Sequence, residues 1–245
     1  MQLHPERVLE IAQSLGTVML EPRQSVRESA YKGCITSIRA NKSPDEDDTQ
    51  QVHSTGDMPL HIDQALTAPS QQPTYYLLGC VRPPVLGNGG DTVISFNQPV
   101  LDKLSPEQTE LLRQSRQRIL RDRDGMQVSG STFISTLDGQ DYLSFWNKGT
   151  YGEDWVLDTP PGYTQAEVKQ AVSTVLSAAH DPENARFVPW QAGRIMIADN
   201  HQSLHGRTAQ LQPSSRELLH AKVLPEGEMP EIYFAKQTSA VDLQA

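Results

Sequence analysis

Short segments with the composition and alternation of β-strands, separated by turn residues, constrain the fold of this chain most. The segment 73–81 is rich in Thr, Tyr, Leu and Val, and turn residues within 83–90 separate it from a second segment, 92–96. Similar segments recur later in the chain, at 132–137, 142–146, 193–199 and 218–224. Such a series of strands joined by turns is typical of antiparallel sheets. The sequence therefore predicts a mainly β protein with flanking helices and a barrel or jelly-roll architecture.

Three segments have helical patterns and are expected to cover this sheet system. Residues 4–15 place apolar side chains at helical spacing, and Gly16 follows as a stop signal. Capping boxes that begin at Ser105 and Thr164 open two further helices, because in each a Glu or Gln stands three residues after the cap.

The organisation of the chain indicates one domain over residues 1–245, since no internal repeat and no linker divides it. The segment 41–58 is polar and acidic and has almost no large apolar side chains. We expect it to be a mobile loop whose carboxylates are solvated.

Charge and composition disfavour several classes of partner. The chain has 21 Lys and Arg against 30 Asp and Glu, a formal net charge of −9. Nucleic acid and anionic membranes would repel such a chain at long range, so neither is expected as a partner. The longest apolar runs are too short to span a bilayer, and the N-terminus lacks a secretory signal pattern. With two cysteines and no CxxC pair, a cytoplasmic protein is expected.

Motifs for several common chemistries are missing from the sequence. It contains no GxxxxGK[ST] phosphate loop, no GxSxG nucleophile turn and no HExxH helix. The glycine-rich stretch LGNGGD lacks the GxGxxG spacing, so a dinucleotide fold is not expected.

His61 and Asp63 are separated by one residue, so on a strand both side chains would project from the same face. An imidazole and a carboxylate so placed can occupy two adjacent positions of an octahedral metal ion. A third neutral ligand from elsewhere would complete the two-histidine, one-carboxylate face that binds non-haem Fe(II). The same spacing recurs at His4 and Glu6, so the pair also fits a strand-end histidine beside a solvated carboxylate.

A second region with candidate functional residues lies in the last third of the sequence. Residues 197–207, IADNHQSLHGR, contain a strand, a polar turn and then His205. Arg216 follows across another turn, on the next predicted strand. If these two strands form an antiparallel pair, Arg216 returns to the depth of the metal, where its planar guanidinium suits a carboxylate.

Several segments of the chain together carry a resemblance to a known family. They are MPLHIDQAL, GNGGDTVISF and WQAGRIMIADNHQSLHGR, followed by SSRELLHAKV, in this order between residues 55 and 223. In order and spacing they resemble the Fe(II)- and 2-oxoglutarate-dependent dioxygenases, in the branch of taurine dioxygenase and clavaminate synthase. The resemblance implies a double-stranded β-helix (jelly-roll) core and Fe(II) ligands at His61, Asp63 and His205. It also implies that Thr92 and Arg216 hold 2-oxoglutarate, which O2 oxidises to succinate and carbon dioxide as a substrate C–H bond is oxidised.

The resemblance also bears on the substrate. Halogenating relatives have a small residue in place of the carboxylate ligand, so Asp63 favours hydroxylation. Desaturation, ring closure and epimerisation share its first step and stay open. Relatives that accept sulfonates carry a second Arg where this chain has His220, so a small amino acid or a natural-product intermediate is expected instead. Asp57, Gln64, Arg207 and His220 are candidates for contacts with this small-molecule substrate.

The resemblance leaves oligomeric state open. Family members usually carry an additional strand and helix before the segment that matches residues 11–16. A homodimer would let a second subunit supply this part of the substrate cover.

Two other functions remain open from the sequence. An iron oxidase that does not use 2-oxoglutarate would not need the pair Thr92 and Arg216, and the presence of both disfavours it. A metal-binding β-barrel without catalysis would show no turnover of the keto acid. The substitution Arg216→Ala separates an oxygenase from such a module, which has no turnover to lose.

Overall fold

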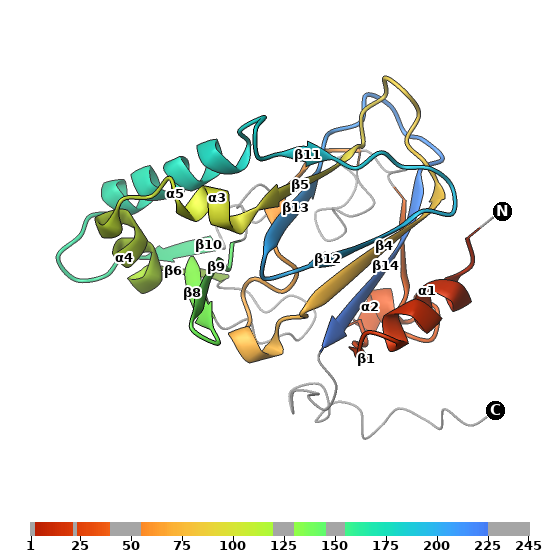
Figure 1. The fold of residues 1–245 in the computed structure, drawn as a ribbon, viewed down its shortest axis with the longest axis horizontal. Helices are drawn as coiled ribbons and strands as arrows, with labels where there is room; N and C mark the ends of the chain where they lie inside the picture. The colour runs from red at the N-terminus through yellow and green to blue at the C-terminus, as the bar shows by residue number, and fades with distance from the viewer. Residues whose placement is uncertain (1–2, 22–23, 40–54, 120–129, 146–154, 225–245) are drawn as a thin grey trace.

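The strands of the molecule form two main antiparallel sheets (Figure 1). A computed structural model describes residues 3–21, 24–39, 55–119, 130–145 and 155–224. The first sheet contains β1 (Thr17–Val18), β2 (Thr36–Arg39), β4 (Tyr75–Arg82), β12 (Ile195–Asp199) and β14 (Glu217–Leu224). Its order is β1–β14–β4–β12, with β2 also paired to β14. The second sheet contains β3 (Met58–His61), β5 (Thr92–Phe96), β11 (Arg186–Phe187) and β13 (Ser203–Arg207), in the order β11–β5–β13–β3.

Two smaller antiparallel sheets lie beside the second main sheet. One has the order β10–β6–β7 and consists of β6 (Arg116–Ile119), β7 (Ser131–Thr132) and β10 (Trp155–Asp158). The other is a hairpin of β8 (Ile134–Leu137) and β9 (Gln140–Leu143).

Helices cover two sides of the strands (Figure 1). They are α1 (Pro5–Gln13), α2 (Gln24–Arg27), α3 (Asn97–Leu101), α4 (Pro106–Gln114) and α5 (Gln165–Ala179), with a 3-10 turn at Pro69–Gln71. Both predicted capping boxes are present and open α4 and α5. α1 packs its apolar face on β14 and β4, whereas α3, α4 and α5 enclose a separate apolar core with β8 and β9.

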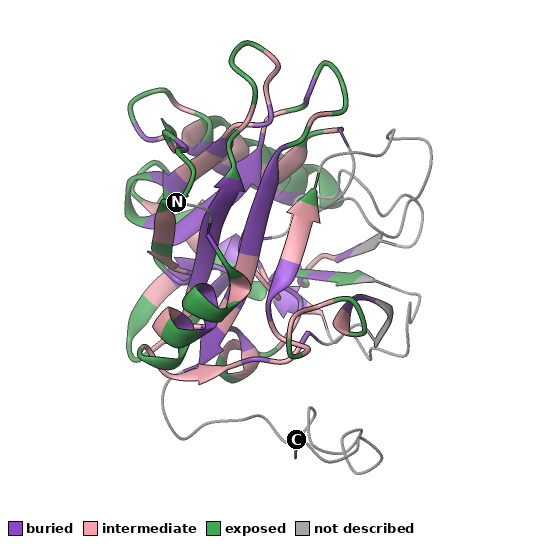
Figure 2. Cartoon of the chain, turned by 90° about the vertical axis from the view of Figure 1, so that its right-hand side faces the viewer, coloured by how far each residue is buried: buried purple, intermediate pink, exposed green. Residues whose placement is uncertain are grey.

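The two main sheets face each other across a buried interior. Tyr76 of β4 stacks on His205 of β13, with 4.1 Å between the ring centroids. Around this contact lies a cluster of buried side chains from the first sheet and from Trp190. Figure 2 shows the central strands largely buried, whereas most of the exposed residues lie on the helices and loops. The predicted mainly β architecture with flanking helices is confirmed.

Two strand expectations from the sequence are wrong. β3 ends at His61, so Asp63 lies in the following turn rather than on the strand. The chain leaves the ladder there because the N–H of Ile62 donates to the carbonyl of Phe145, and Gln64 then adopts a left-handed conformation with φ of 56°. β13 and β14 are not an antiparallel pair, because they belong to opposite sheets.

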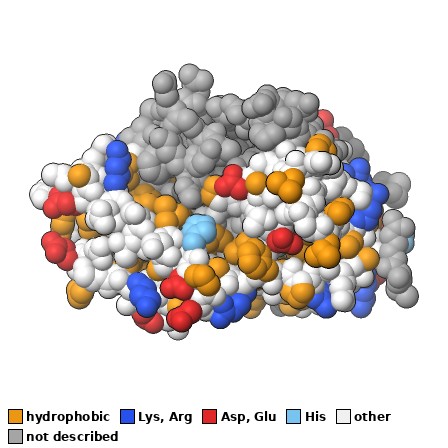
Figure 3. Space-filling model, turned by 90° about the horizontal axis from the view of Figure 1, so that it is seen from above, with side chains coloured by type: hydrophobic (Ala, Val, Ile, Leu, Met, Phe, Trp, Pro, Cys, Tyr) orange, Lys and Arg blue, Asp and Glu red, His pale blue; other side chains and the backbone are white. Residues whose placement is uncertain are grey.

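Most of the predicted acidic loop at 41–58 lies outside the described residues. The structure describes its last residues, of which Met58 begins β3. Among the residues described, no helix is long and apolar enough to cross a membrane. On the face seen in Figure 3, hydrophobic side chains lie in several small groups with acidic and basic side chains between them.

Candidate metal centre

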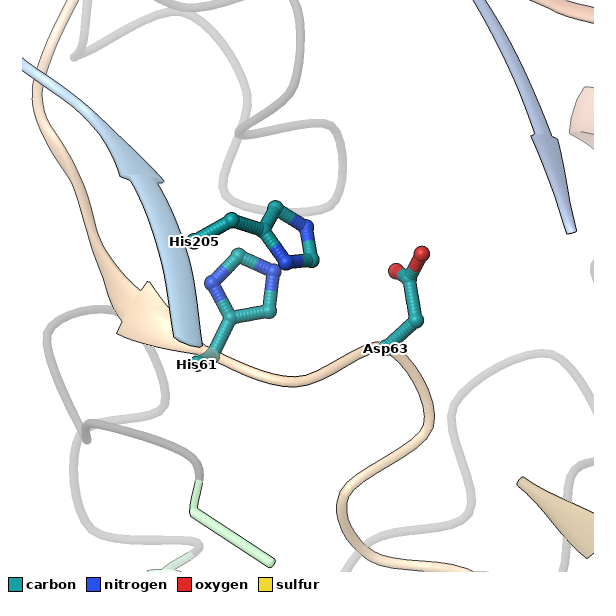
Figure 4. A group of neighbouring side chains, drawn as sticks. All are labelled: His61, Asp63 and His205. Atoms are coloured by element: carbon teal, nitrogen blue, oxygen red, sulfur yellow. The ribbon is translucent and has the colours of Figure 1, made fainter. Parts of the chain in front are cut away.

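His61, Asp63 and His205, the predicted iron ligands, lie together in the interior between the main sheets. One ligand atom from each lies within 4.8 Å of the others. Figure 4 shows the two imidazole rings side by side and the Asp63 carboxylate facing them from the turn after β3. The two histidines meet because they are direct partners in the antiparallel pairing of β3 with β13, which leaves 4.4 Å between their ring centroids.

Gly206 allows β13 to approach β3 this closely. A Cβ atom at this position would lie 2.6 Å from the carbonyl oxygen of Met58, well inside van der Waals contact. The absence of a side chain at Gly206 is therefore part of what brings His205 to His61.

Asn200 holds the backbone of Asp63 in place. The N–H of Asp63 donates to Oδ1 of Asn200 over 2.9 Å, and Nδ2 of Asn200 donates to the carbonyl of Asp63 over 3.1 Å. Asn200 is fully buried, and its backbone N–H donates to the carbonyl of Thr74. The side chain of Asn200 thus makes the backbone hydrogen bonds that a neighbouring strand would make if Asp63 lay on β3.

The protonation of the two histidines suits metal binding. Nδ1 of His61 lies 2.7 Å from the carbonyl oxygen of Pro59, which can only accept, so Nδ1 carries the proton and Nε2 keeps its lone pair. Burial lowers the pKa of His61, and burial together with the neighbouring His61 lowers the pKa of His205 well below its ordinary value. Both imidazoles are therefore neutral at pH 7.

The carboxylate of Asp63 is ionised and is held in place by a third histidine, His220. Burial alone would raise its pKa, but the charge and hydrogen bond of His220, with the charge of Lys222, hold the pKa of Asp63 well below its usual range. Nε2 of His220 lies 2.8 Å from Oδ2 of Asp63. His220 makes this contact from β14, across the interior, and so engages one of the two carboxylate oxygens.

These residues fit an Fe(II) ion. Two neutral imidazoles and one carboxylate are the donor set of non-haem iron sites that keep positions open. Nδ1 of His205 is buried and has no hydrogen-bond partner among the described residues, as expected for a nitrogen whose partner is a metal ion or a metal-bound group. His220 and the Pro59 carbonyl supply the outer hydrogen bonds that orient metal ligands.

Arg216 and Thr92 form a buried site for an anion. Nη2 of Arg216 lies 3.3 Å from Oγ1 of Thr92, so a residue just before β14 reaches the first residue of β5 across the interior. Nε and Nη1 of Arg216 are buried without a hydrogen-bond partner in the described part of the chain. Burial, reinforced by the charge of Arg207, lowers the pKa of Arg216 to about 9. A bound carboxylate would offset that destabilisation of the guanidinium.

The four residues predicted to contact the substrate differ in burial and in their hydrogen-bond partners. Asp57 is exposed in the segment that enters β3, and Gln64 follows Asp63 in the left-handed conformation. Arg207 is buried on β13, where Nη2 donates to the carbonyl of Gly56 over 2.8 Å. Burial lowers the pKa of Arg207 to about 10, although Asp57 opposes the shift. His220, as described above, contacts Asp63; a substrate contact of any of these four residues stays a prediction.

Asn200 and Trp190 are site residues that sequence reasoning missed. The sequence pattern places Asn200 only in a polar turn, and it does not single out Trp190 as a site residue. Nε1 of Trp190 in fact donates to Oγ1 of Thr92 over 2.9 Å. Their partners lie 137 and 98 residues away along the chain, and no local pattern signals contacts at such separations.

Comparison with known proteins gives a family match and several similar structures. The profile described as "Taurine catabolism dioxygenase TauD, TfdA family" matches residues 1–222. A relative, the 3-((Z)-2-isocyanoethenyl)-1H-indole synthase of Fischerella ambigua, is 24% identical over 204 residues, which are 78% of this chain and 71% of the relative. The PvcB protein of Pseudomonas aeruginosa has a TM-score of 0.67 and 18% identity over 91% of this chain and 72% of PvcB. Asparagine oxygenase (AsnO) has a TM-score of 0.67 and 17% identity over 90% of this chain and 63% of AsnO. The structural likenesses confirm the predicted jelly-roll fold.

Proposed function

The chain belongs to the TauD, TfdA family of dioxygenases, and is thus an Fe(II)- and 2-oxoglutarate-dependent dioxygenase; from this premise we propose which residues perform its reaction. His61, Asp63 and His205 bind Fe(II), and Thr92 and Arg216 bind the distal carboxylate of 2-oxoglutarate. The observation that carries this proposal is that the group His61, Asp63 and His205 and the pair Thr92 and Arg216 both lie in the buried interior between the two main sheets.

The residues of the chain have separate tasks in this reaction. With Fe(II) bound, 2-oxoglutarate and O2 supply the oxidant that removes hydrogen from a substrate C–H bond. Arg216 neutralises the distal carboxylate and Thr92 donates a hydrogen bond to it, which orients the keto acid toward the ligand triad. Asn200 and His220 keep Asp63 in the position that its neutral partners, His61 and His205, require. Tyr76 covers one face of His205 and excludes water from it.

The substrate is a small molecule, and we infer an amino acid or a natural-product intermediate. Structures with the same fold include asparagine oxygenase with 3-hydroxyasparagine and succinate, and OrfP with hydroxyarginine. Asp63 keeps the carboxylate among the ligands, which favours hydroxylation as the outcome. Asp57, Gln64, Arg207 and His220 remain the residues to test for substrate contact.

Four further expectations belong to the same proposal. Residues 1–245 act as one oxygenase domain in the cytoplasm, without nucleic acid or membrane, as the net charge of −9 favours. A homodimer is the oligomeric state to test, and light scattering after gel filtration measures it directly.

An anaerobic titration tests the ligand assignment. Purified protein is loaded with Fe(II) and then titrated with 2-oxoglutarate, while the weak visible charge-transfer band of a keto acid chelated to ferrous iron is recorded. We expect the band in the wild type, its loss in His205→Ala and its weakening in Arg216→Ala. Iron binding without a band would overturn the 2-oxoglutarate assignment and favour an iron oxidase of another kind or a binding module.

A further inference from the structure

Backbone hydrogen bonds to β5 bring Trp190 to the candidate 2-oxoglutarate site. β11 pairs with β5, and the N–H of Val188 continues this contact by donating to the carbonyl of Thr92 over 2.9 Å. Two residues later, the indole of Trp190 lies against Thr92, and its Nε1 donates to Oγ1 over 2.9 Å. Both side chains are buried, with exposed fractions of 9% for Trp190 and 2% for Thr92.

The hydrogen bonds at Thr92 determine what its hydroxyl group can still do. A threonine hydroxyl accepts two hydrogen bonds and donates one, whereas an indole N–H and a guanidinium can only donate. Trp190 and Arg216 therefore occupy the two acceptor positions of Oγ1, at 2.9 and 3.3 Å. The hydroxyl hydrogen is left to donate, and the described residues show no acceptor bonded to it.

We propose that Trp190 is a positioning residue of the 2-oxoglutarate site. By donating to Thr92 it fixes the rotation of the hydroxyl, so that the O–H points to the same carboxylate that the unpartnered nitrogens of Arg216 bind. Trp190 does not touch the cosubstrate and acts through Thr92. The inference rests on the proposed function, because it assumes that this carboxylate belongs to 2-oxoglutarate.

The packing around Trp190 decides which substitution is informative. Trp190 lies in the buried cluster that contains Tyr76, whose ring stacks on the candidate ligand His205. Truncation to Ala would open a cavity there and disturb the metal centre as well. Trp190→Phe removes the N–H and keeps most of the ring. Leu78→Val, in the same cluster, is the matched control for a small loss of volume without a lost hydrogen bond.

Binding of 2-oxoglutarate to the Co(II)-loaded protein, measured by calorimetry, tests the inference without turnover. A hydrogen bond to a carboxylate contributes enough that Thr92→Val should raise the Kd for 2-oxoglutarate roughly 30-fold. Trp190→Phe should raise it about tenfold, because the hydroxyl remains but can rotate away. Leu78→Val should bind 2-oxoglutarate like the wild type. In the double variant, Trp190→Phe should add nothing to Thr92→Val, since its only route to the ligand is then absent.

A second probe and the Co(II) affinity separate this role from packing. The keto acid 2-oxopentanoate has a methyl group in place of the distal carboxylate, so Trp190→Phe should leave its Kd unchanged. The Kd for Co(II) should also stay at the wild-type value. If the wild type binds 2-oxoglutarate and Trp190→Phe binds it equally well, or if the two substitutions are additive, the inference is overturned and the proposed function stands. If the Co(II)-loaded wild type binds no 2-oxoglutarate, the proposed function itself fails.

Discussion

Asn200→Ala is the substitution that most directly tests how the chain positions its carboxylate ligand. The Asn200 side chain makes two hydrogen bonds to the backbone of Asp63, at 2.9 and 3.1 Å. Their loss leaves a donor and an acceptor of Asp63 without partners, at about 1 kcal/mol for each bond and somewhat more for the buried group. We expect a total of about 2–3 kcal/mol, which lowers Tm by roughly 5–10 °C in a chain of this size.

The effect on metal binding is the decisive part of this prediction. Asp63 lies beyond the end of β3 and has the left-handed Gln64 after it, so Asn200 is what fixes its backbone. Removal of an outer hydrogen bond that orients a metal ligand typically weakens metal binding about 10- to 100-fold. We expect a loss in this range for Co(II), measured by calorimetry on the metal-free protein.

Asn97→Ala is the matched control for Asn200→Ala. Asn97 is also a buried asparagine, and its Nδ2 donates over 2.7 Å to the carbonyl of His201, in the same turn between β12 and β13. Its loss should lower Tm and leave the Co(II) affinity within about twofold of the wild type. The reasoning is refuted if Asn200→Ala keeps the wild-type affinity, or if Asn97→Ala weakens metal binding as much.

Substitutions at three further positions test other contacts of the site. His220→Leu removes the hydrogen bond to Asp63 and should raise the Kd for Co(II) about 10- to 100-fold, whereas His220→Gln, which retains a donor, should recover most of the affinity in the same titration. Gly206→Ala places a Cβ 2.6 Å from the carbonyl oxygen of Met58, so it should separate β13 from β3, lower Tm by several degrees and reduce the Tm increase that Co(II) produces in a thermal shift assay. Arg216→Lys keeps the charge but loses the planar fork, and a Kd for 2-oxoglutarate raised at least about tenfold is expected; an unchanged Kd would place the carboxylate elsewhere.

The sequence predicted elements well wherever the signal is local. The capping boxes at Ser105 and Thr164 open α4 and α5 as expected, because each depends on residues within one turn of helix. The strands 92–96 and 195–199 likewise follow from composition and from the turns beside them. The spacing of His61 and Asp63 is not specific by itself, because it recurs at His4 and Glu6; the resemblance singled out this pair and supplied His205.

What the sequence could not predict depends on contacts between distant residues. The pattern His-x-Asp predicted a strand through Asp63, but the ladder ends at His61 because the carbonyl of Phe145 takes the N–H of Ile62. Arg216 was expected to reach the metal by pairing of β14 with β13. It reaches the interior instead because the two strands lie in opposite sheets that face each other.

The same facing sheets explain why the metal and cosubstrate sites cannot be perturbed independently by packing changes. β3 and β13 of one sheet carry His61 and His205, while β14 of the other carries His220 and begins directly after Arg216. Tyr76 and Trp190 fill the interior between them, one against His205 and the other against Thr92. A cavity at either aromatic residue would change the spacing of the sheets, and with it both sites. Substitutions that remove a hydrogen-bonding group and keep most of the volume, such as Trp190→Phe and Thr92→Val, are therefore the ones whose effects on metal and on 2-oxoglutarate can be told apart.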